Sequence, residues 1–366
     1  MKLVYVHLGN AKAPWVYGGI KRHKQLFPEI DIALISDSPK VLSKAKNLDC
    51  EIFRYTSSAD VEGLLSRASH PKKFRNNFWK TSLERLFAIN RFHETCKSSA
   101  LLHVESDVIL FPNFPWKRVR ELDKLTWFSA NENLDCAALL FTPNFENSEW
   151  LSRELQKSIS LDPNLTDMQA LYDIRKRNKN QIRLFPSSAP AIADQGLLVN
   201  DRRFLEITSM TNFFGGIFDA LNMGMWLTGQ NPRNLGGKVI RYEHFFVQDN
   251  RFTQQTFSNV AEYFFVGDSE KTEIFSLHVH SKNPKLLSQS WKKELTILIA
   301  ESRSLDNKES FSSQAWVGSI HDTLVSVNYN PVKFLASFSV VRKFLRSLKK
   351  FLSVDLSKCR FRGSYD

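Results

Sequence analysis

The segment LLHVESDVIL, residues 101–110, is an apolar and partly β-branched run that two acids interrupt. A run of this kind is typical of a buried strand in a parallel sheet, where acids are expected only at a binding site. Glu105 and Asp107 are two residues apart, so their side chains point the same way in an extended backbone. Open α/β sheets bind ligands at the carboxyl ends of their strands. The two acids therefore predict a Mg²⁺ or Mn²⁺ site that carries substrate phosphates.

The alternative is a chance occurrence, because Asp and Glu are common and many chains contain an acid-x-acid triplet. The context favours a site, since the triplet lies inside the apolar run and a turn signal, FPNFP at residues 111–115, follows it directly. Ser106 points away from the two acids by alternation, and we expect it to contribute packing or a backbone hydrogen bond at the cofactor site.

Strand and helix patterns alternate on either side of this segment. Before it, we expect strands at 2–8, 31–36 and 51–55, and helices at 40–46, 59–66 and, with clear amphipathic spacing, 77–95. After it, residues 125–129 and 136–142 are expected to form two antiparallel strands. Such alternation predicts an α/β fold whose mostly parallel central sheet carries helices on both faces.

Residues that directly follow the first two strands are candidates by position, because parallel strands bring their carboxyl ends to one edge of the sheet. They are His7, Gly9 and Asn10 after the first strand and Asp37 after the second. The alternative is that these residues only form turns, since Asn and Asp favour turns. Arg85 lies near the apolar face of the long helix, where an unpaired charge is costly, so it is a candidate to bind substrate phosphates.

The acidic motif follows an N-terminal α/β half and resembles the DxD motif of glycosyltransferases with the GT-A fold. The variant here is Glu105-Ser106-Asp107, and the resemblance covers roughly residues 1–285. It implies a GT-A fold and a Mn²⁺ or Mg²⁺ ion that both acids hold against the diphosphate of a nucleotide sugar, of the UDP or GDP type. It also implies that Asn10 and Asp37 contact the base and the ribose.

A second similarity lies in FSLHVHSK, residues 275–282. Many metal-dependent members of this family supply a further ligand, often a histidine, from a late segment, with basic residues near the diphosphate. His278 and His280 share one strand face, so the resemblance implies that either is the further ligand. Lys282 is then the basic residue beside the diphosphate.

The segment FFGGIFDAL, residues 213–221, combines a glycine pair with an acid at the start of an expected helix. It resembles the glycine-rich loop that supplies the catalytic base in several inverting GT-A enzymes. Asp219 is therefore the candidate base that takes a proton from the acceptor hydroxyl. The alternative is a carboxylate that complements a helix dipole, and a retaining mechanism is then equally open.

Thr166 and Asp167 are interpreted as a helix cap and its first turn.

The composition agrees with a large enzyme domain. The chain has 366 residues, of which 42% are hydrophobic, enough for a sizeable core. We expect a nucleotide-sugar-binding half at 1–115, an acceptor-binding half at 116–300, and a linker with a basic helical tail at 301–366. The four cysteines form no CxxC pair, which argues against a zinc site and a disulfide framework. The start of the sequence lacks a signal-peptide pattern, so we expect a cytoplasmic protein.

The charge and the last part of the chain indicate partners besides the sugar donor. The net charge of +12 predicts attraction to polyanions. The segment VRKFLRSLKKFL, residues 341–352, is basic and amphipathic, which fits either a helix on an anionic membrane surface or one packed on the domain. The basic residues are spread out and no nucleic-acid-binding motif is present, so nucleic acid is not an expected partner.

The expected function follows from the resemblance and from elimination, since no Walker A, GxGxxG, GxSxG or HExxH motif is present. It is a metal-dependent glycosyltransferase of the hexosyltransferase type. The expected acceptor is a glycan or a lipid-linked molecule, in polysaccharide or surface glycan synthesis, and the expected location is cytoplasmic or peripheral at the membrane. Two alternatives stay open: a basic protein that binds nucleic acid or a membrane, and a nucleotidyltransferase on a similar sheet.

Overall fold

The structure is a computed structural model that describes residues 1–9, 14–68, 77–96, 100–131, 133–187, 202–220, 222–228, 257–260, 263–266, 272–288 and 290–306. The chain divides into two compact units, Met1–Asn307 and Lys308–Asp366, and every described residue belongs to the first. The basic segment at 341–352 therefore lies outside the described residues. No described helix has both the length and the apolar character needed to cross a membrane.

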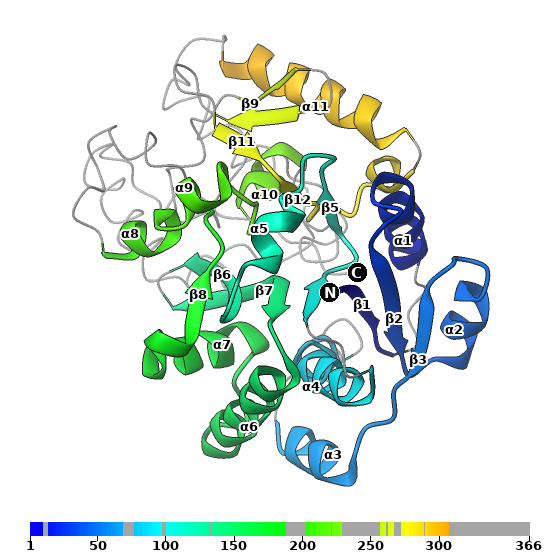
Figure 1. Cartoon of the computed structure of the whole chain (residues 1–366), viewed down its shortest axis with the longest axis vertical. Coiled ribbons are helices and arrows are strands. Elements are labelled where there is room, and N and C mark those ends of the chain that lie inside the picture. The colour runs from blue at the N-terminus through cyan, green and yellow to red at the C-terminus, as the bar shows by residue number, and fades with distance from the viewer. Residues whose placement is uncertain are drawn as a thin grey trace, which may run out of the picture. The chain divides into compact units, whose positions relative to one another are not determined.

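Seven strands among the described residues form the central sheet: β1 (Lys2–His7), β2 (Asp31–Ser36), β3 (Glu51–Arg54), β4 (Leu101–Val104), β6 (Leu125–Asn131), β7 (Leu134–Thr142) and β8 (Ile182–Leu184). Their order across the sheet is β3-β2-β1-β4-β7-β6-β8 (Figure 1). The pairs among β3, β2, β1 and β4 are parallel, β7 is antiparallel to β4 and β6, and β8 is parallel to β6. The predicted α/β fold with a mostly parallel central sheet is confirmed.

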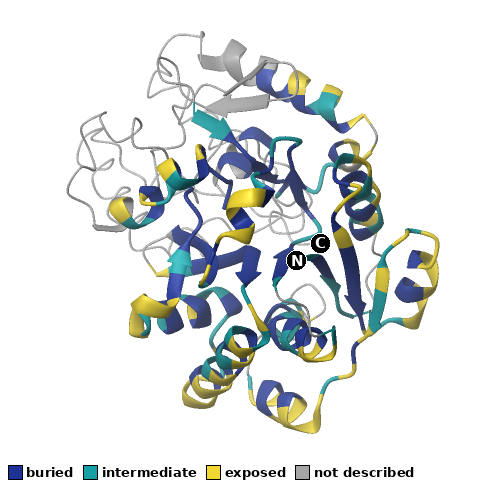
Figure 2. Cartoon of the chain, viewed as in Figure 1, coloured by how far each residue is buried: buried dark blue, intermediate teal, exposed yellow. Residues whose placement is uncertain are grey.

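The described helices are α1 (Pro14–Leu26), α2 (Pro39–Ala45), α3 (Ala59–Ser66), α4 (Phe78–Cys96), α5 (Trp116–Arg120), α6 (Phe145–Leu161), α7 (Asp167–Arg177), α8 (Arg202–Thr208), α9 (Thr211–Phe214), α10 (Asn222–Thr228) and α11 (Trp291–Asp306), with short 3₁₀ turns η1 (Lys179–Gln181) and η5 (Pro284–Leu287). They cover both faces of the sheet. Side chains alternate along each strand, so each strand has apolar residues that pack against helices on either face. In β1, Tyr5 packs into the core that contains Ile20 of α1, whereas Val4 packs into the core that contains Phe87 of α4. The inner strands of the sheet are accordingly buried, whereas the edge strand β3 is partly exposed, as are the outer sides of the helices (Figure 2).

The acidic segment departs from the single strand that its sequence predicts. Strand β4 ends at Val104, a turn follows in which the Val108 N–H donates to Glu105 O at 3.0 Å, and a new strand, β5 (Val108–Leu110), leaves the central sheet. The backbone is therefore not extended between Glu105 and Asp107. The reason is a second partner, since β5 pairs antiparallel with β12 (Ser276–His278), a strand from far along the chain.

Three further strands, β9 (Phe257–Val260), β10 (Tyr263–Val266) and β11 (Thr272–Ile274), form an antiparallel sheet of their own among the described residues. The β5–β12 pair has a separate core that includes Ile109, Leu277 and Trp291, the last from α11. This packing fixes the late segment against the turn that carries the two acids. The site therefore lies where the central sheet and the β5–β12 pair meet.

Candidate functional site

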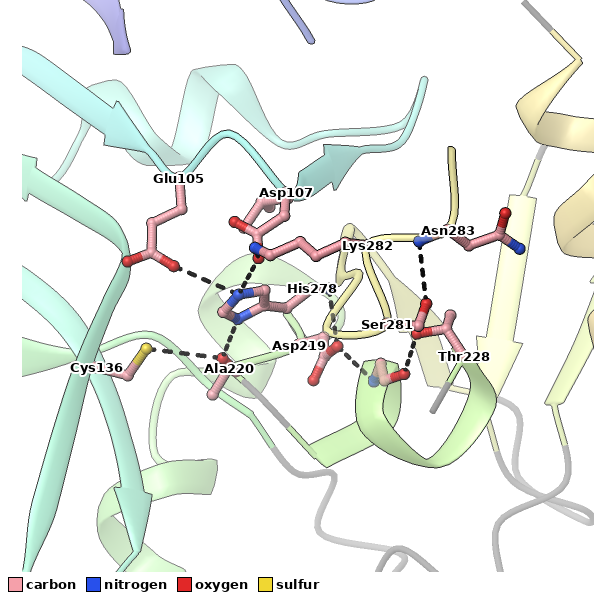
Figure 3. Close-up of polar contacts among 12 residues, drawn as sticks. Glu105, Asp107, Cys136, Asp219, Ala220, Thr228, His278, Ser281, Lys282 and Asn283 are labelled. Atoms are coloured by element: carbon pink, nitrogen blue, oxygen red, sulfur yellow. Dashed lines mark hydrogen bonds and ion pairs between the residues drawn. The ribbon is translucent and has the colours of Figure 1, made fainter. Parts of the chain in front are cut away.

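The structure brings together Glu105, Asp107 and His278, each with one ligand atom, and these atoms all lie within 4.8 Å of one another (Figure 3). His278 Nε2 is 3.1 Å from Asp107 Oδ2 and 3.3 Å from Glu105 Oε2. The β5–β12 ladder produces this meeting, because it places His278 opposite Val108, and the Val279 N–H donates to Asp107 O at 2.8 Å. Three of the four candidate metal ligands therefore form one cluster.

The donor set is suited to a divalent cation. Two carboxylates and one imidazole supply hard oxygens and one nitrogen, a mixture that fits Mn²⁺ better than Mg²⁺, which is usually held through oxygen. A set of three protein ligands also leaves coordination positions for substrate oxygens. Among the described residues, His280 is not a member of this group, although its ring centroid lies 4.2 Å from that of His278.

Two basic side chains contact the acids. The Lys282 ammonium pairs with Asp107 Oδ2, and the Arg85 guanidinium pairs with Glu105. The backbone of Lys282 is left-handed, with a φ of 55°, a conformation that non-glycine residues seldom adopt. Arg85 also binds Asp167 Oδ2 at 3.1 Å, so this charge near the apolar face of α4 is compensated by two carboxylates. Arg85 thus holds a candidate ligand, and Lys282 lies beside Asp107.

These charges set the protonation of the cluster. Burial raises the pKa of Asp107, but Lys282 and His278 outweigh burial and hold that pKa well below its usual range. Arg85 and His278 likewise lower the pKa of Glu105 despite its burial. Burial by itself lowers the pKa of His278, yet the attraction of Asp107 and Glu105 overcomes it and raises the pKa to about 9. Both acids are therefore ionised at neutral pH.

The predicted base, Asp219, lies next to the cluster but is 1% exposed. Its carboxylate accepts backbone hydrogen bonds from Met223 at 3.1 Å, Gly224 at 2.6 Å and His278 at 2.9 Å. These donors surround both oxygens, and the first two lie in the first turn of α10. The geometry favours the alternative interpretation, a carboxylate at the start of a helix, so we do not propose Asp219 as the general base.

The loops after β1 and β2 meet at the same edge of the sheet. The Gly9 N–H donates to both oxygens of Asp37, at 2.9 and 3.1 Å, and Gly9 has a φ of 85°, which favours glycine. His7, the last residue of β1, is in register with Ser36. Since β1 lies beside β4, these residues lie at the edge that carries Glu105. Asn10 lies outside the described residues, and Ser106 lies in the turn between the acids.

Two contacts at the candidate site have no counterpart among the predictions from sequence. The expected helix start at Thr166 is confirmed, since Thr166 and Gln169 form a capping box, but Asp167 is also the buried partner of Arg85. The carbonyl of Ala220 accepts a hydrogen bond from His278 Nδ1 at 3.0 Å and one from the Cys136 thiol at 3.8 Å. Neither contact has a sequence signal, because Asp167 has the ordinary position of a helix-start acid and Ala220 acts through its backbone.

No protein-family model and no curated protein sequence matches this chain. Among solved structures, the galactosyltransferase LgtC in complex with donor and acceptor sugar analogues is 12% identical, covers 57% of this chain and 84% of its own, and has a TM-score of 0.38. The glycosyltransferase GlyE from Streptococcus pneumoniae TIGR4 is 15% identical, with 50% and 44% covered and a TM-score of 0.34. The bifunctional IspDF from Campylobacter jejuni is 12% identical, with 50% and 48% covered and a TM-score of 0.27.

Proposed function

We propose that this protein is a metal-dependent glycosyltransferase that moves a sugar from a nucleotide-diphosphate sugar to an acceptor hydroxyl. The observation that supports it most is the cluster of Glu105, Asp107 and His278 at the carboxyl edge of the sheet, with Lys282 beside it. A divalent cation with two or three protein ligands and a nearby ammonium is an arrangement that binds a diphosphate. The loops at Gly9 and Asp37 lie at the same edge and are the proposed contacts of the nucleoside.

Each charged residue of the site has a separate proposed role. When bound, the cation supplies a Lewis acid that neutralises charge on the departing nucleoside diphosphate. Lys282, which is half-buried at Asp107, is placed to pair with a phosphate oxygen. Arg85 keeps Glu105 ionised and oriented from the protein side. Among the residues that the structure describes, no arginine pairs with Asp107 in this way, so we expect substitution of Asp107 to weaken binding more than substitution of Glu105.

The test is calorimetric titration of UDP and GDP into the protein, with Mn²⁺ and with EDTA. We expect one nucleotide to bind in Mn²⁺ only, and Asp107→Asn to abolish that binding. The matched control is Asp123→Asn, because Asp123 is 62% exposed, pairs with Arg183 and lies just before β6, at the opposite edge of the sheet. Binding that is equal in EDTA contradicts the metal dependence, and an absence of nucleotide binding in both conditions contradicts the proposed function.

We infer a glycan or lipid-linked acceptor, transfer of the hexosyltransferase type, and contact with an anionic membrane. The support is the reaction class together with the basic amphipathic sequence at 341–352, which lies outside the described residues. The test is flotation of the full chain with vesicles that contain or lack anionic lipid. We expect binding to the anionic vesicles, weakened by salt and by replacement of the five Lys and Arg residues of this segment with Gln. Equal recovery with both vesicle types contradicts it.

A further inference from the structure

The carboxylate of Asp219 joins two segments that are far apart in the sequence. It accepts the N–H groups of Met223 and Gly224 in α10. It also accepts the N–H of His278 in β12 at 2.9 Å (Figure 3). Orphan N–H groups at a helix start are normally satisfied by a nearby side chain. Here the same side chain also binds the backbone of a predicted metal ligand. Asp219 therefore fixes the position of His278 relative to α10.

The ring of His278 is oriented by Ala220, the residue that follows Asp219. The Ala220 carbonyl lies 3.0 Å from Nδ1, which leaves Nε2 directed at Glu105 and Asp107. A hydrogen bond from one imidazole nitrogen to a backbone carbonyl is a common way to orient a histidine that binds metal through the other nitrogen. Residues 219 and 220 thus hold the backbone and the ring of His278 together.

The close packing at Gly224 is independent evidence that α10 and His278 are held together. A Cβ added there would lie 1.8 Å from His278 O and 2.7 Å from Asp219 Oδ2, so any side chain would displace the strand or the helix. The position of Gly224 is further held by the Thr228 hydroxyl, which donates to its carbonyl at 2.7 Å. Helix α10 therefore packs directly on the backbone of His278.

We propose that Asp219 and Gly224 are positioning residues that orient His278 as the third ligand of the cation. This inference rests on the proposed function of the site. It assigns Asp219 a role different from that of a general base, and the two roles are separable. A base acts in the transfer step and leaves cation binding unchanged, whereas a residue that positions a ligand acts on cation binding before any nucleotide is present.

The first test is Mn²⁺ titration without nucleotide. We expect Asp219→Ala and Gly224→Ala to weaken Mn²⁺ affinity about 10–100-fold, the usual effect of losing an outer-shell partner. Asp219→Asn is expected to lose less, since its carbonyl can keep the bonds to Gly224 and His278. The matched controls are Asp123→Asn and Gly63→Ala, because a Cβ at Gly63 in α3 meets no atom within 4 Å. Both controls should bind Mn²⁺ like the wild type.

The second test needs no cation. Hydrogen exchange of the peptide that covers 276–282 should be faster in Asp219→Ala than in the wild type and unchanged in Gly63→Ala. Unchanged exchange, or Mn²⁺ affinity that Asp107→Asn abolishes but Asp219→Ala and Gly224→Ala leave intact, overturns this positioning role and leaves the proposed function standing. If the wild type does not bind Mn²⁺, the proposed function fails, and so does this assignment.

Discussion

The guanidinium of Arg85 shows how a single residue connects the site to the core. It lies between Glu105 of the acidic turn and Asp167 of α7, and the three side chains are at most 20% exposed. A buried charge is tolerated when it is paired, but removal of one partner leaves the others uncompensated. Because Arg85 serves two carboxylates, its loss affects both the stability of the fold and the geometry of a predicted ligand.

We expect Arg85→Met to lower the free energy of unfolding by about 3–5 kcal/mol, since two buried carboxylates lose their cation. Chemical denaturation measures this change. The control is Arg91→Met on the same helix, because Arg91 is 61% exposed and, among the described residues, pairs with Glu94, and such a pair contributes about 0.5 kcal/mol or less. Equal effects of the two substitutions would show that Arg85 is not an internal counter-ion.

We expect the imidazole of His278 to release a proton when the cation binds. Despite burial, Asp107 and Glu105 raise its pKa to about 9, so Nε2 is protonated at pH 7.5 and must lose its proton to act as a ligand. Mn²⁺ binding should therefore release close to one proton at this pH, and the apparent affinity should rise as pH approaches 9. Calorimetry in two buffers of different ionisation enthalpy counts the protons. Release of none at pH 7.5 contradicts the assignment.

At the scale of elements, two helix starts offer a matched pair. The Thr166 side chain caps α7 and the Ser58 side chain caps α3, each by accepting a backbone N–H. Only α7 carries a residue of the site, because Asp167 follows its cap directly and binds Arg85. The two caps therefore contribute similar stability but have different functional surroundings.

We expect Thr166→Ala and Ser58→Ala each to cost about 1 kcal/mol of stability, the usual value of an N-cap. Only Thr166→Ala should also weaken Mn²⁺ affinity, because fraying of the first turn of α7 displaces Asp167 and, through Arg85, Glu105. Denaturation and Mn²⁺ titration of both variants give the two readouts. Equal Mn²⁺ affinity in both variants would show that α7 does not support the site.

The whole molecule should lose stability in mild acid because it buries neutral histidines. Burial, followed by the charge of Arg22, lowers the pKa of His23 well below its ordinary 6.5, and burial with Arg85 lowers that of His103 to about 3. Both rings stay neutral in the folded protein, whereas the unfolded chain binds a proton on each below pH 6.5. The free energy of unfolding is therefore unaffected by these two histidines above pH 6.5, and it decreases as the pH falls below 6.5.

His103 should cost about 2 kcal/mol between pH 6.5 and pH 5, at about 1.4 kcal/mol per pH unit below 6.5, and His23 should shift the stability in the same direction. His278 contributes little in this range, since its ring is protonated in the folded protein and the unfolded ring, with an ordinary pKa near 6.5, gains only about half a proton. Denaturation at a series of pH values measures the slope. His103→Asn keeps a donor toward Val4 O, which now faces Nδ1 at 3.1 Å, and should reduce the slope by one proton. An unchanged slope would contradict the prediction.

Local patterns in the sequence were enough to predict the architecture and the main candidates. Period-two and helical spacing are properties of neighbouring residues, so the strands of the N-terminal half and the long helix before the acids could be placed from sequence. The acids at the end of a buried run marked Glu105 and Asp107 for the same reason. His278 and Lys282 were selected through the resemblance and lie at the cluster.

The sequence by itself determined the mostly parallel α/β sheet and the acids at its carboxyl edge, because both depend on residues close together in the chain. Only the tertiary structure decided which of His278 and His280 joins those acids, that Arg85 pairs with Asp167, and that Asp219 holds a backbone. The physical reason is distance along the chain: His278 and Asp107 are separated by 171 residues, and Arg85 and Asp167 by 82. Such contacts arise from the packing of β12 on β5 and of α7 on α4, for which no local spacing exists.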